Sequence, residues 1–367
     1  MARAVQQPRP FAGALAALRQ TAALVLLALL PAALVLAIVG GAIGHQFAFD
    51  FHGSIWQAAR DVLHGHNPYP PPTAAGVAPG DRFVYPPAVA FAFIPLGVLP
   101  FPVAAACITV VLLAAIAATL YVLEVRDWRC YGAAYLSIPV LHDVRLGALT
   151  PLLALGIALA WQWRDRARSA IPFAFVIVAK LFLWPLGVWL LATGRVRIAL
   201  RTALYGLAAS AIAWAAIGFA GLADYPRLLQ VLASSEQSRG YSPVSALLAL
   251  GLGGSAARIV ATAVGLALLA GCAIVGRRGD DRRSLILAVA AALVLSPIVW
   301  LHYFVLLLVP IALARRTFSL IWLVPLLFWA TPYEEHFGDH WRIGVGIAVA
   351  ALALAASWRP QSILTEM

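Results

Sequence analysis

Charged residues are scarce in this chain. They make up 11% of its 367 residues, while 63% are hydrophobic and the mean hydropathy is +0.89. A soluble globular domain carries about 25% charged residues, so this composition excludes an ordinary soluble protein and indicates a polytopic membrane protein. No polar stretch is long enough for a separate soluble domain. We therefore expect one integral domain over residues 1–367, embedded in the lipid bilayer.

Cysteine and lysine are rare as well. The three cysteines lie in or beside apolar runs without metal-ligand spacing, so they imply no disulfide framework and indicate buried free thiols. Lysine occurs once, at Lys180, so arginine supplies nearly all of the positive charge behind the net value of +11. In a soluble protein this charge would favour nucleic acid as a partner. Here the arginines cluster between apolar runs, where positive cytoplasmic loops explain them, and we expect no nucleic acid.

Several catalytic motifs are missing too. The chain has no Walker-type loop, no Ser-His-Asp arrangement and no CxxC pair, which argues against a nucleotide-binding domain. Histidine and acidic residues do cluster in one short loop at 334–340. A solvated turn explains this cluster better than a metal site, so we assign no metal ligand and no cofactor.

Long apolar runs are abundant. The first, 21–43, is about 23 residues long, which is enough to cross a bilayer alone and longer than the core of a cleaved signal peptide. Together the runs predict an all-α protein with about twelve transmembrane helices, with full spans at 102–122, 202–222 and 257–275 among them. Residues 84–99 are apolar but broken by three prolines, which kink helices. We expect a re-entrant or juxtamembrane segment there, and a full crossing is the alternative.

The charges of the loops predict the orientation. Eighteen of the 26 basic residues fall in loops that this layout places inside, in agreement with the positive-inside rule. Both termini then lie in the cytoplasm beneath the inner (plasma) membrane, and the outer loops are 44–87 and 223–242. All eight histidines fall toward the outer, periplasmic face, so the chemistry is expected on that side.

The outer loop 44–87 holds the sharpest catalytic candidate. Asp50 stands about seven residues after the first apolar run, near the membrane, where ionisable groups are costly and tend to persist for chemistry or binding. We interpret Asp50 as a catalytic base; a solvated acid near a helix end is the alternative. Trp56, Tyr69 and Tyr85 in the same loop are either interfacial anchors or walls for a sugar.

The cationic candidates lie within or beside apolar runs. Lys180 stands alone in such a run, where an unpaired ammonium is costly. It either snorkels to the interface or contacts a lipid phosphate. Arg145 is either a second phosphate ligand or the ion partner of Asp143. His302, close to Trp300 between two runs, is either a hydrogen-bonded structural residue or part of the site.

Several short stretches together resemble a known family. They read Asp50-Phe51, Gly65-His66-Asn67-Pro68-Tyr69, Tyr85-Pro86-Pro87, Lys180 with Pro185, and Ser296-Pro297-Ile298-Val299-Trp300-Leu301-His302-Tyr303. In order and topology they are similar to glycosyltransferase family 87 of the GT-C superfamily, the polytopic polyprenol-phosphate-mannose-dependent alpha-mannosyltransferases of bacteria. One position departs from that family's pattern, which has Gly-Gln where this chain has Gly147-Ala148, so donor or acceptor preference can differ.

The resemblance implies a GT-C fold with an active site on the outer face. It implies inverting transfer of a sugar, mannose above all, from a polyprenyl-phosphate donor to a glycolipid or glycan acceptor, as in cell-envelope glycolipid biosynthesis. A lipid phosphate leaves without a nucleotide, so no cofactor is implied. The site residues are Asp50 as base; Lys180, Arg145 and His302 on the donor phosphate; and Trp56, Tyr69, Tyr85 and Trp300 on the substrates.

The main alternative is a transporter or flippase for a lipid-linked sugar. Broken helices and charges within the membrane suit transporters. Transporters often carry two matching halves, which this sequence lacks, and transport does not need a long first loop that bears an acid. A non-catalytic assembly partner is a third hypothesis, favoured only by Ala148 at the position of the glutamine.

Overall fold

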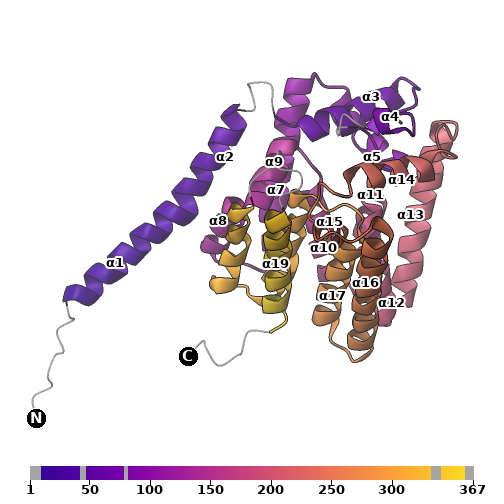
Figure 1. The fold of residues 1–367 in the computed structure, drawn as a ribbon. Helices are drawn as coiled ribbons and strands as arrows, with labels where there is room; N and C mark the ends of the chain where they lie inside the picture. Colours follow the sequence, from indigo (N-terminus) through magenta and orange to yellow (C-terminus); the bar gives the residue numbers. More distant parts are fainter. Residues whose placement is uncertain (1–9, 42–46, 78–81, 332–339, 360–367) are drawn as a thin grey trace, which may run out of the picture.

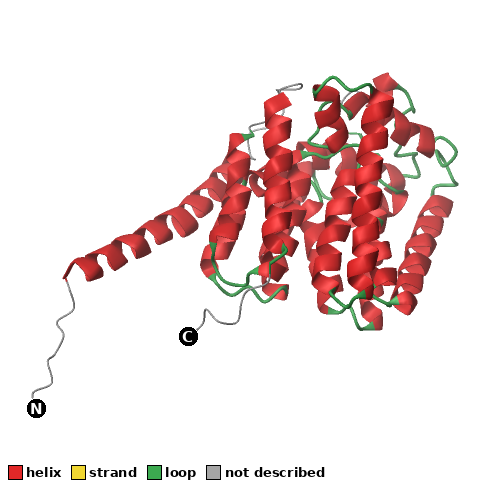
Figure 2. Ribbon diagram, turned by 60° about the horizontal axis from the view of Figure 1, so that its bottom comes forward, coloured by secondary structure: helices red, strands yellow, loops and turns green. Residues whose placement is uncertain are grey.

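The structure is a computed structural model that describes residues 10–41, 47–77, 82–331 and 340–359. Most of these residues are in helices, the rest are in loops and turns, and none of them forms a strand (Figure 2), which confirms the all-α class. Most helices pack side by side into one bundle, and the first helix leans away from it (Figure 1). The hydrophobic core runs through this bundle.

The helices follow one another with short connections. Those of the first part are α1 (Pro10–Leu24), η1 (Val25–Leu29), α2 (Leu30–Gly41), η2 (Phe51–Trp56), α3 (Gln57–Leu63), α4 (Ala74–Val77), α5 (Pro87–Ala92), α6 (Ile94–Gly97), α7 (Phe101–Val122), α8 (Trp128–Leu136), α9 (Ile138–Leu146) and α10 (Thr150–Gln162). Those of the second part are η3 (Ala167–Ser169), α11 (Ala170–Ala179), η4 (Leu181–Leu183), α12 (Pro185–Ala192), α13 (Val196–Ala216), α14 (Tyr225–Glu236), α15 (Pro243–Ala249), α16 (Gly254–Arg277), α17 (Asp281–Leu295), η5 (Leu301–Leu307), α18 (Leu308–Ala314), η6 (Leu320–Ala330) and α19 (His340–Ser357). Here η1 and η2 are π-helical, and η3 to η6 are 3₁₀-helical.

Four helices of the described residues are long and apolar enough to cross a membrane. They are the stretch Ala17–Ala37 within α1–α2, then α7, α13 and α16. Helices α9 and α10 are bent by 115° against each other and would form a fifth span if taken together. Five further apolar segments of the described residues have 10–17 residues. These findings agree with a polytopic membrane protein, while a total of about twelve crossings stays a prediction.

One helix differs from its expected bounds, because the expected span began only after two arginines. The spans expected at 102–122 and 257–275 are α7 and α16. The span expected at 202–222 is α13, which begins earlier, at Val196, and ends at Ala216. Arg197 and Arg201 are exposed on its first turns, so the helix includes them without burying a charge.

Residues 84–99 form two short helices. Helix α5 has six residues and α6 has four, whereas a helix needs about 20 residues to cross the hydrocarbon core. Phe93 separates the two helices, and a proline in the first turn of α6 prevents α5 from continuing. The geometry agrees with a re-entrant or juxtamembrane segment.

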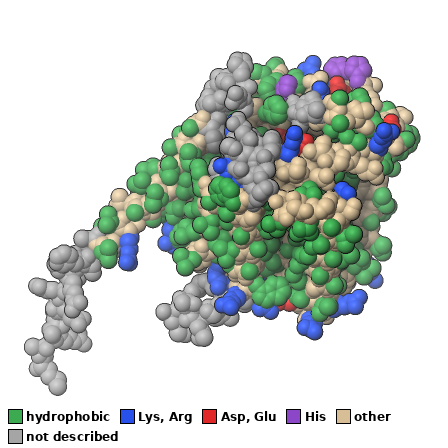
Figure 3. All heavy atoms as spheres, viewed as in Figure 1, with side chains coloured by type: hydrophobic (Ala, Val, Ile, Leu, Met, Phe, Trp, Pro, Cys, Tyr) green, Lys and Arg blue, Asp and Glu red, His purple; other side chains and the backbone are tan. Residues whose placement is uncertain are grey.

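Ion pairs join the loops at one end of the bundle. The Arg195 guanidinium lies 2.7 Å from an oxygen of Asp165 and 2.6 Å from one of Asp281. Arg164 reaches Asp281 at 3.4 Å. In Figure 3, several Lys and Arg side chains line the lower end of the molecule and His side chains lie at its upper end. Some of the arginines therefore connect helix ends through ion pairs.

Asp127 holds another connection between distant loops. One of its carboxylate oxygens accepts a hydrogen bond from the Arg129 amide at 3.1 Å, and so caps α8. The other accepts from the Phe318 amide at 2.9 Å. Because the side-chain hydrogen bond from Arg129 favours the charged form, the pKa of Asp127 lies below its ordinary value, although burial opposes this.

Candidate active site

Asp50 lies directly before η2 and is half-buried. Its segment is docked on the turn between α9 and α10: the Ala48 amide donates to the Arg145 carbonyl oxygen at 2.8 Å. Gly147 in that turn has φ +70°, and a Cβ added to it would lie 2.8 Å from the Phe51 Cβ and 3.1 Å from the Ala48 Cβ. Only glycine allows this close approach without a shift, so the α9–α10 turn fixes the position of Asp50.

The Asp50 carboxylate has polar and charged neighbours from several helices. The Ser54 hydroxyl lies 3.4 Å from its Oδ1, one helical turn further on, and also donates to the Asp50 carbonyl oxygen. Asp50 interacts electrostatically with Lys180, with Tyr85 and with Asp143. The acid therefore belongs to a cluster of titratable groups and is not an isolated loop residue.

Lys180 lies at the end of α11, where the backbone leaves the helix in an extended conformation. Its ammonium donates a hydrogen bond to the Tyr303 hydroxyl at 2.9 Å. It lies 4.5 Å from the centroid of the Tyr85 ring and 4.8 Å from that of Tyr303, within the range of cation–π attraction. The side chain thus turns to the same cluster as Asp50, which argues against the snorkelling alternative.

His302, which is also predicted to bind the donor phosphate, lies beside this cluster on η5. Its imidazole is 95% buried, and its centroid is 4.9 Å from that of Tyr303 and 5.9 Å from that of His142 on α9. His302 also interacts electrostatically with Lys180. Arg145 is half-buried on the last turn of α9 and interacts electrostatically with His142. The structure therefore brings three of the four predicted charged or titratable residues into one cluster and places Arg145 at its edge.

Two of the aromatic candidates hold the outer segments together. The Tyr69 hydroxyl donates to the Tyr85 carbonyl oxygen at 2.9 Å, and its ring stacks on Trp214 with centroids 5.2 Å apart. Burial raises the pKa of Tyr69, with a smaller effect from Tyr225. Trp56 donates from Nε1 to a backbone carbonyl before α7 at 3.2 Å. These contacts explain both side chains structurally, and their role with substrates stays a prediction.

Tyr85 and Trp300 differ from the other aromatic candidates in position. Tyr85 is 95% buried and contacts the Lys180 ammonium through its ring face, so it belongs to the cluster. Trp300 is half-buried at the start of η5 and packs against the hydrophobic core. The residue before it accepts a hydrogen bond at 2.6 Å from the Tyr241 amide, which ties the second outer loop to this segment.

Two residues of the cluster had no predicted role in the site. Asp143 is fully buried on α9, close to Thr150 and within electrostatic reach of Asp50 and Lys180. Its signal in the sequence was an acid in a short polar stretch between two apolar runs. Tyr303 supplies the hydroxyl that receives the Lys180 hydrogen bond. Its contact joins positions 123 residues apart, and no local pattern announces such a pair.

Metal ligands are not grouped in the described part of the chain. Among these residues no set of three or more His, Cys, Asp or Glu side chains could hold a metal ion together. The acidic and histidine cluster expected at 334–340 falls outside the described residues except for the backbone of His340. Ala148, at the position where the resembling family has glutamine, is buried.

A comparison with known families identifies a segment that includes part of the cluster. A family model of glycosyltransferase family 87 matches residues 83–301, more than half of the chain. The chain belongs to glycosyltransferase family 87. This finding confirms the resemblance drawn from the short motifs. The match includes Lys180 but begins after Asp50 and ends before His302. Comparisons with curated proteins and with solved structures found no match.

Membership of family 87 makes this protein a glycosyltransferase. In chemical terms the cluster offers what glycosyl transfer requires. A carboxylate can accept the proton of an attacking hydroxyl, and an ammonium can stabilise the negative charge that develops on a leaving group. Asp50 and Lys180 supply these two groups from chain segments 130 residues apart.

Proposed function

We propose that this family 87 glycosyltransferase moves a sugar, mannose in the first place, from a polyprenyl-phosphate donor to a glycolipid or glycan acceptor. The reaction takes place at the outer face of the inner membrane, with both termini in the cytoplasm. The location of the arginines and histidines along the sequence supports this orientation. The reaction inverts the configuration at the anomeric carbon and uses no cofactor.

The proposed step is a single displacement. The Asp50 carboxylate takes the proton of the acceptor hydroxyl while the hydroxyl oxygen attacks the anomeric carbon. The bond between that carbon and the phosphate oxygen breaks, and polyprenyl phosphate leaves with the electron pair. Lys180 stabilises the phosphate charge. His302 lies next to Lys180 and supports the phosphate, and Arg145 acts at the edge of the same site.

The observation that carries the proposal is the juxtaposition of Asp50 with Lys180. The two groups interact electrostatically, and the ammonium is oriented by Tyr303 and Tyr85. A carboxylate base and a cation in one cluster match the separate needs of the acceptor and of the leaving group.

The experiment is a transfer assay with purified protein in detergent. Polyprenyl-phosphate-[³H]mannose is the donor, and a membrane lipid extract supplies acceptors. We expect a radiolabelled glycolipid whose new linkage has the anomeric configuration opposite to that of the donor. Digestion with anomer-specific mannosidases reads this configuration. Folded protein that transfers no sugar to any acceptor contradicts the proposal, and retention of configuration contradicts the single displacement.

The same assay separates the enzyme from a transporter or flippase for a lipid-linked sugar. Detergent solution has no compartments, so a flippase gives no covalent product there. Reconstitution in vesicles with a fluorescent lipid-linked sugar then tests flipping directly. Transfer in detergent without flipping in vesicles supports the enzyme, and the opposite pair of results supports the transporter.

A further inference from the structure

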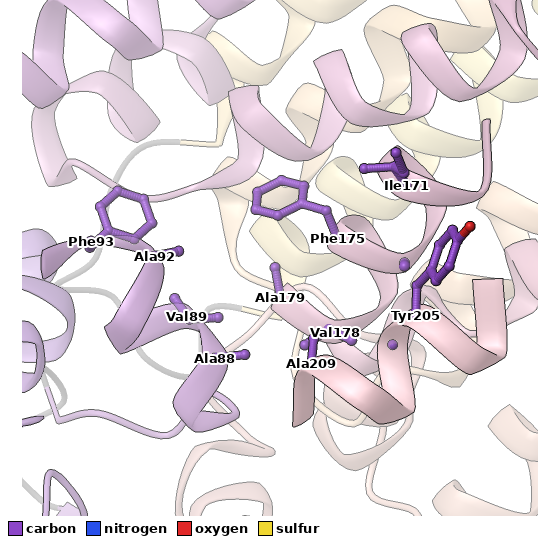
Figure 4. Close-up of a pocket in the computed structure, with 12 residues that line it drawn as sticks. Ala88, Val89, Ala92, Phe93, Ile171, Phe175, Val178, Ala179, Tyr205 and Ala209 are labelled. Carbon is purple, nitrogen blue, oxygen red and sulfur yellow. The ribbon is translucent and has the colours of Figure 1, made fainter. Parts of the chain in front are cut away.

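Two exposed arginines lie at one end of the seam between α11 and α13. Arg168, in η3, comes three residues before Ile171 of α11. Arg201, on α13, comes four residues before Tyr205. Ile171 and Tyr205 line the same cavity of about 440 Å³ between these helices and α5 (Figure 4), and η3 itself packs against α13. Both arginines therefore lie at the same end of the seam, and together with Tyr205 we call them the Arg168–Arg201 site.

Both arginines keep an unbalanced positive charge. In the part of the chain that the structure describes, no carboxylate forms an ion pair with Arg168 or Arg201. The two acids of the adjoining loops, Asp165 and Asp281, lie 2.7 and 2.6 Å from the Arg195 guanidinium. Since Arg195 engages these acids, the Arg168–Arg201 site is left to bind an anion from outside the chain.

The depth of the site follows from the lengths of its helices. Helix α13 is a candidate membrane span of 21 residues, or about 31 Å at 1.5 Å per residue, which matches a hydrocarbon core of about 30 Å. Arg201 stands in its second turn, near the level of the lipid headgroups. The ten residues of α11, about 15 Å long, lie between η3 and Lys180. The site is therefore separate from the proposed site of the donor phosphate.

Arg168 is held in place by an aromatic ring. Its guanidinium carbon lies 4.2 Å from the centroid of the Trp163 ring, within the range of cation–π attraction. Stacking uses the face of the guanidinium and leaves the N–H donors at its edge available, and these fit the oxygens of a phosphate. The contact with Trp163 thus prepares Arg168 to bind a phosphate group.

The surface next to the two arginines becomes apolar along α13. Leu200, Leu204 and Leu207 are all exposed, and their spacing of four and three residues places them on one face of the helix. Ile171 of α11 is exposed as well, and the Tyr205 hydroxyl comes between this surface and the charges. A phospholipid has the same order of groups, since its phosphate is followed by polar glycerol esters and then by acyl chains.

We propose that the Arg168–Arg201 site binds one anionic phospholipid of the bilayer. The two arginines hold its phosphate, the Tyr205 hydroxyl donates to a glycerol ester, and the acyl chains lie along the exposed leucines of α13. A phospholipid with a choline headgroup brings its own positive charge, which two unbalanced arginines disfavour. The site therefore selects phosphatidylglycerol over phosphatidylcholine. This inference goes beyond sugar transfer and does not depend on it.

A double substitution tests the site. Arg168→Gln with Arg201→Gln removes two positive charges. The matched control is Arg277→Gln with Arg278→Gln, because these arginines are also exposed and form no ion pair with a described residue, at the end of α16 next to the loop that carries Asp281. The probe is dioleoyl phosphatidylglycerol, titrated onto the purified full chain in detergent, and native mass spectrometry counts the bound lipid.

Each lost arginine should weaken lipid binding about fivefold, so the first double variant should bind about 25-fold more weakly. The control should bind like the unmodified chain. Equal losses in both variants mean a general attraction to net charge and overturn the proposal, as does no loss in the first variant. Arg168→Lys with Arg201→Lys keeps both charges and should retain most of the affinity. A loss as large as with glutamine also overturns the proposal.

Competition identifies which part of the lipid is recognised. Dioleoyl phosphatidylcholine has the same chains with a different headgroup, and glycerol 3-phosphate has the phosphate without chains. Neither should displace dioleoyl phosphatidylglycerol at equal concentration. Equal displacement by phosphatidylcholine means an unselective apolar surface, and equal displacement by glycerol 3-phosphate means a simple anion site. Either result overturns the proposal.

Photolabelling of the unmodified protein gives a measurement that does not depend on how a variant folds. The probe is phosphatidylglycerol with a diazirine near the middle of one acyl chain. We expect the label on peptides from α11 and α13, and labelling mainly on other helices overturns the proposal. None of these experiments needs a sugar donor or an acceptor, so the phospholipid site and the proposed function can fail separately.

Discussion

Replacing Asp50 by asparagine tests the assignment of the base most directly. The substitution keeps the size of the side chain. It also leaves an oxygen that can accept from the Ser54 hydroxyl, which lies 3.4 Å from Asp50 Oδ1 in the unmodified protein. The contacts that dock this segment, from the Ala48 amide to the Arg145 carbonyl and around Gly147, involve backbone and Cβ atoms. They are unaffected by the change, so the variant should fold.

The expected loss is therefore chemical. A general base contributes typically about 10²–10⁴-fold to the rate, and we expect kcat of Asp50→Asn to fall by that factor. The carboxylate also interacts electrostatically with Lys180. Its removal leaves the ammonium with less competition for phosphate, so the donor KM should stay equal or decrease. Initial rates at several donor concentrations measure both quantities.

Asp61→Asn is the control in the same outer loop. The hydrogen bonds that His64 and His66 make to Asp61, at 3.2 and 2.7 Å, go to its backbone oxygen, so they survive the substitution. Burial raises the pKa of the Asp61 carboxyl, and the charges of His66, His64 and Arg60 lower it. This variant should keep most of its turnover. An inactive Asp61→Asn variant together with an active Asp50→Asn variant would mean that Asp50 is not the base. Two active variants would refute a catalytic role for the loop.

Three further predictions concern other parts of the molecule. Lys180→Ala should raise the donor KM roughly ten- to a hundredfold, because a lost charge-assisted contact costs about 1.5–3 kcal/mol, and should leave the acceptor KM unchanged. Gly147→Ala should lower kcat, since its Cβ would push on the segment that carries Asp50, and Ala48→Gly should restore part of the loss by removing a Cβ 3.1 Å away. Asp127 has a lowered pKa, so its contribution to stability is present above about pH 4, the unfolded value, and is lost as the pH falls toward the folded value; Asp127→Asn should therefore flatten the acid side of the unfolding curve.

Each of these predictions has its own contrary result. An unchanged donor KM for Lys180→Ala would return this residue to the snorkelling explanation. A Gly147→Ala variant with normal kcat would mean that the α9–α10 turn does not position the base. An Asp127→Asn variant whose thermal unfolding in detergent depends on pH between 2 and 6 like that of the unmodified protein would place the acid sensitivity elsewhere.

Composition and local pattern were sufficient for the class of the protein. Few charges and many apolar runs predicted an all-α membrane protein. Helices are expected there because backbone groups in lipid must pair within their own segment, and the structure confirms them. Short motifs around Asp50, Tyr85 and Lys180 predicted the family, which the match over 83–301 confirms. Three prolines indicated that 84–99 is broken, since each removes a backbone donor. All of these signals lie within a few neighbouring residues.

The composition of the site was decided by tertiary structure. Lys180 gains its hydrogen-bond partner from Tyr303, 123 residues further on, and no periodicity of the sequence connects two such positions. Asp143 joins the cluster, and Tyr69 holds the backbone of Tyr85, only because packed helices bring their segments together. Sequence by itself determined which side chains were costly enough to need a partner in a membrane. Which partners they have depends on contacts between distant segments, and those exist only when the chain is folded.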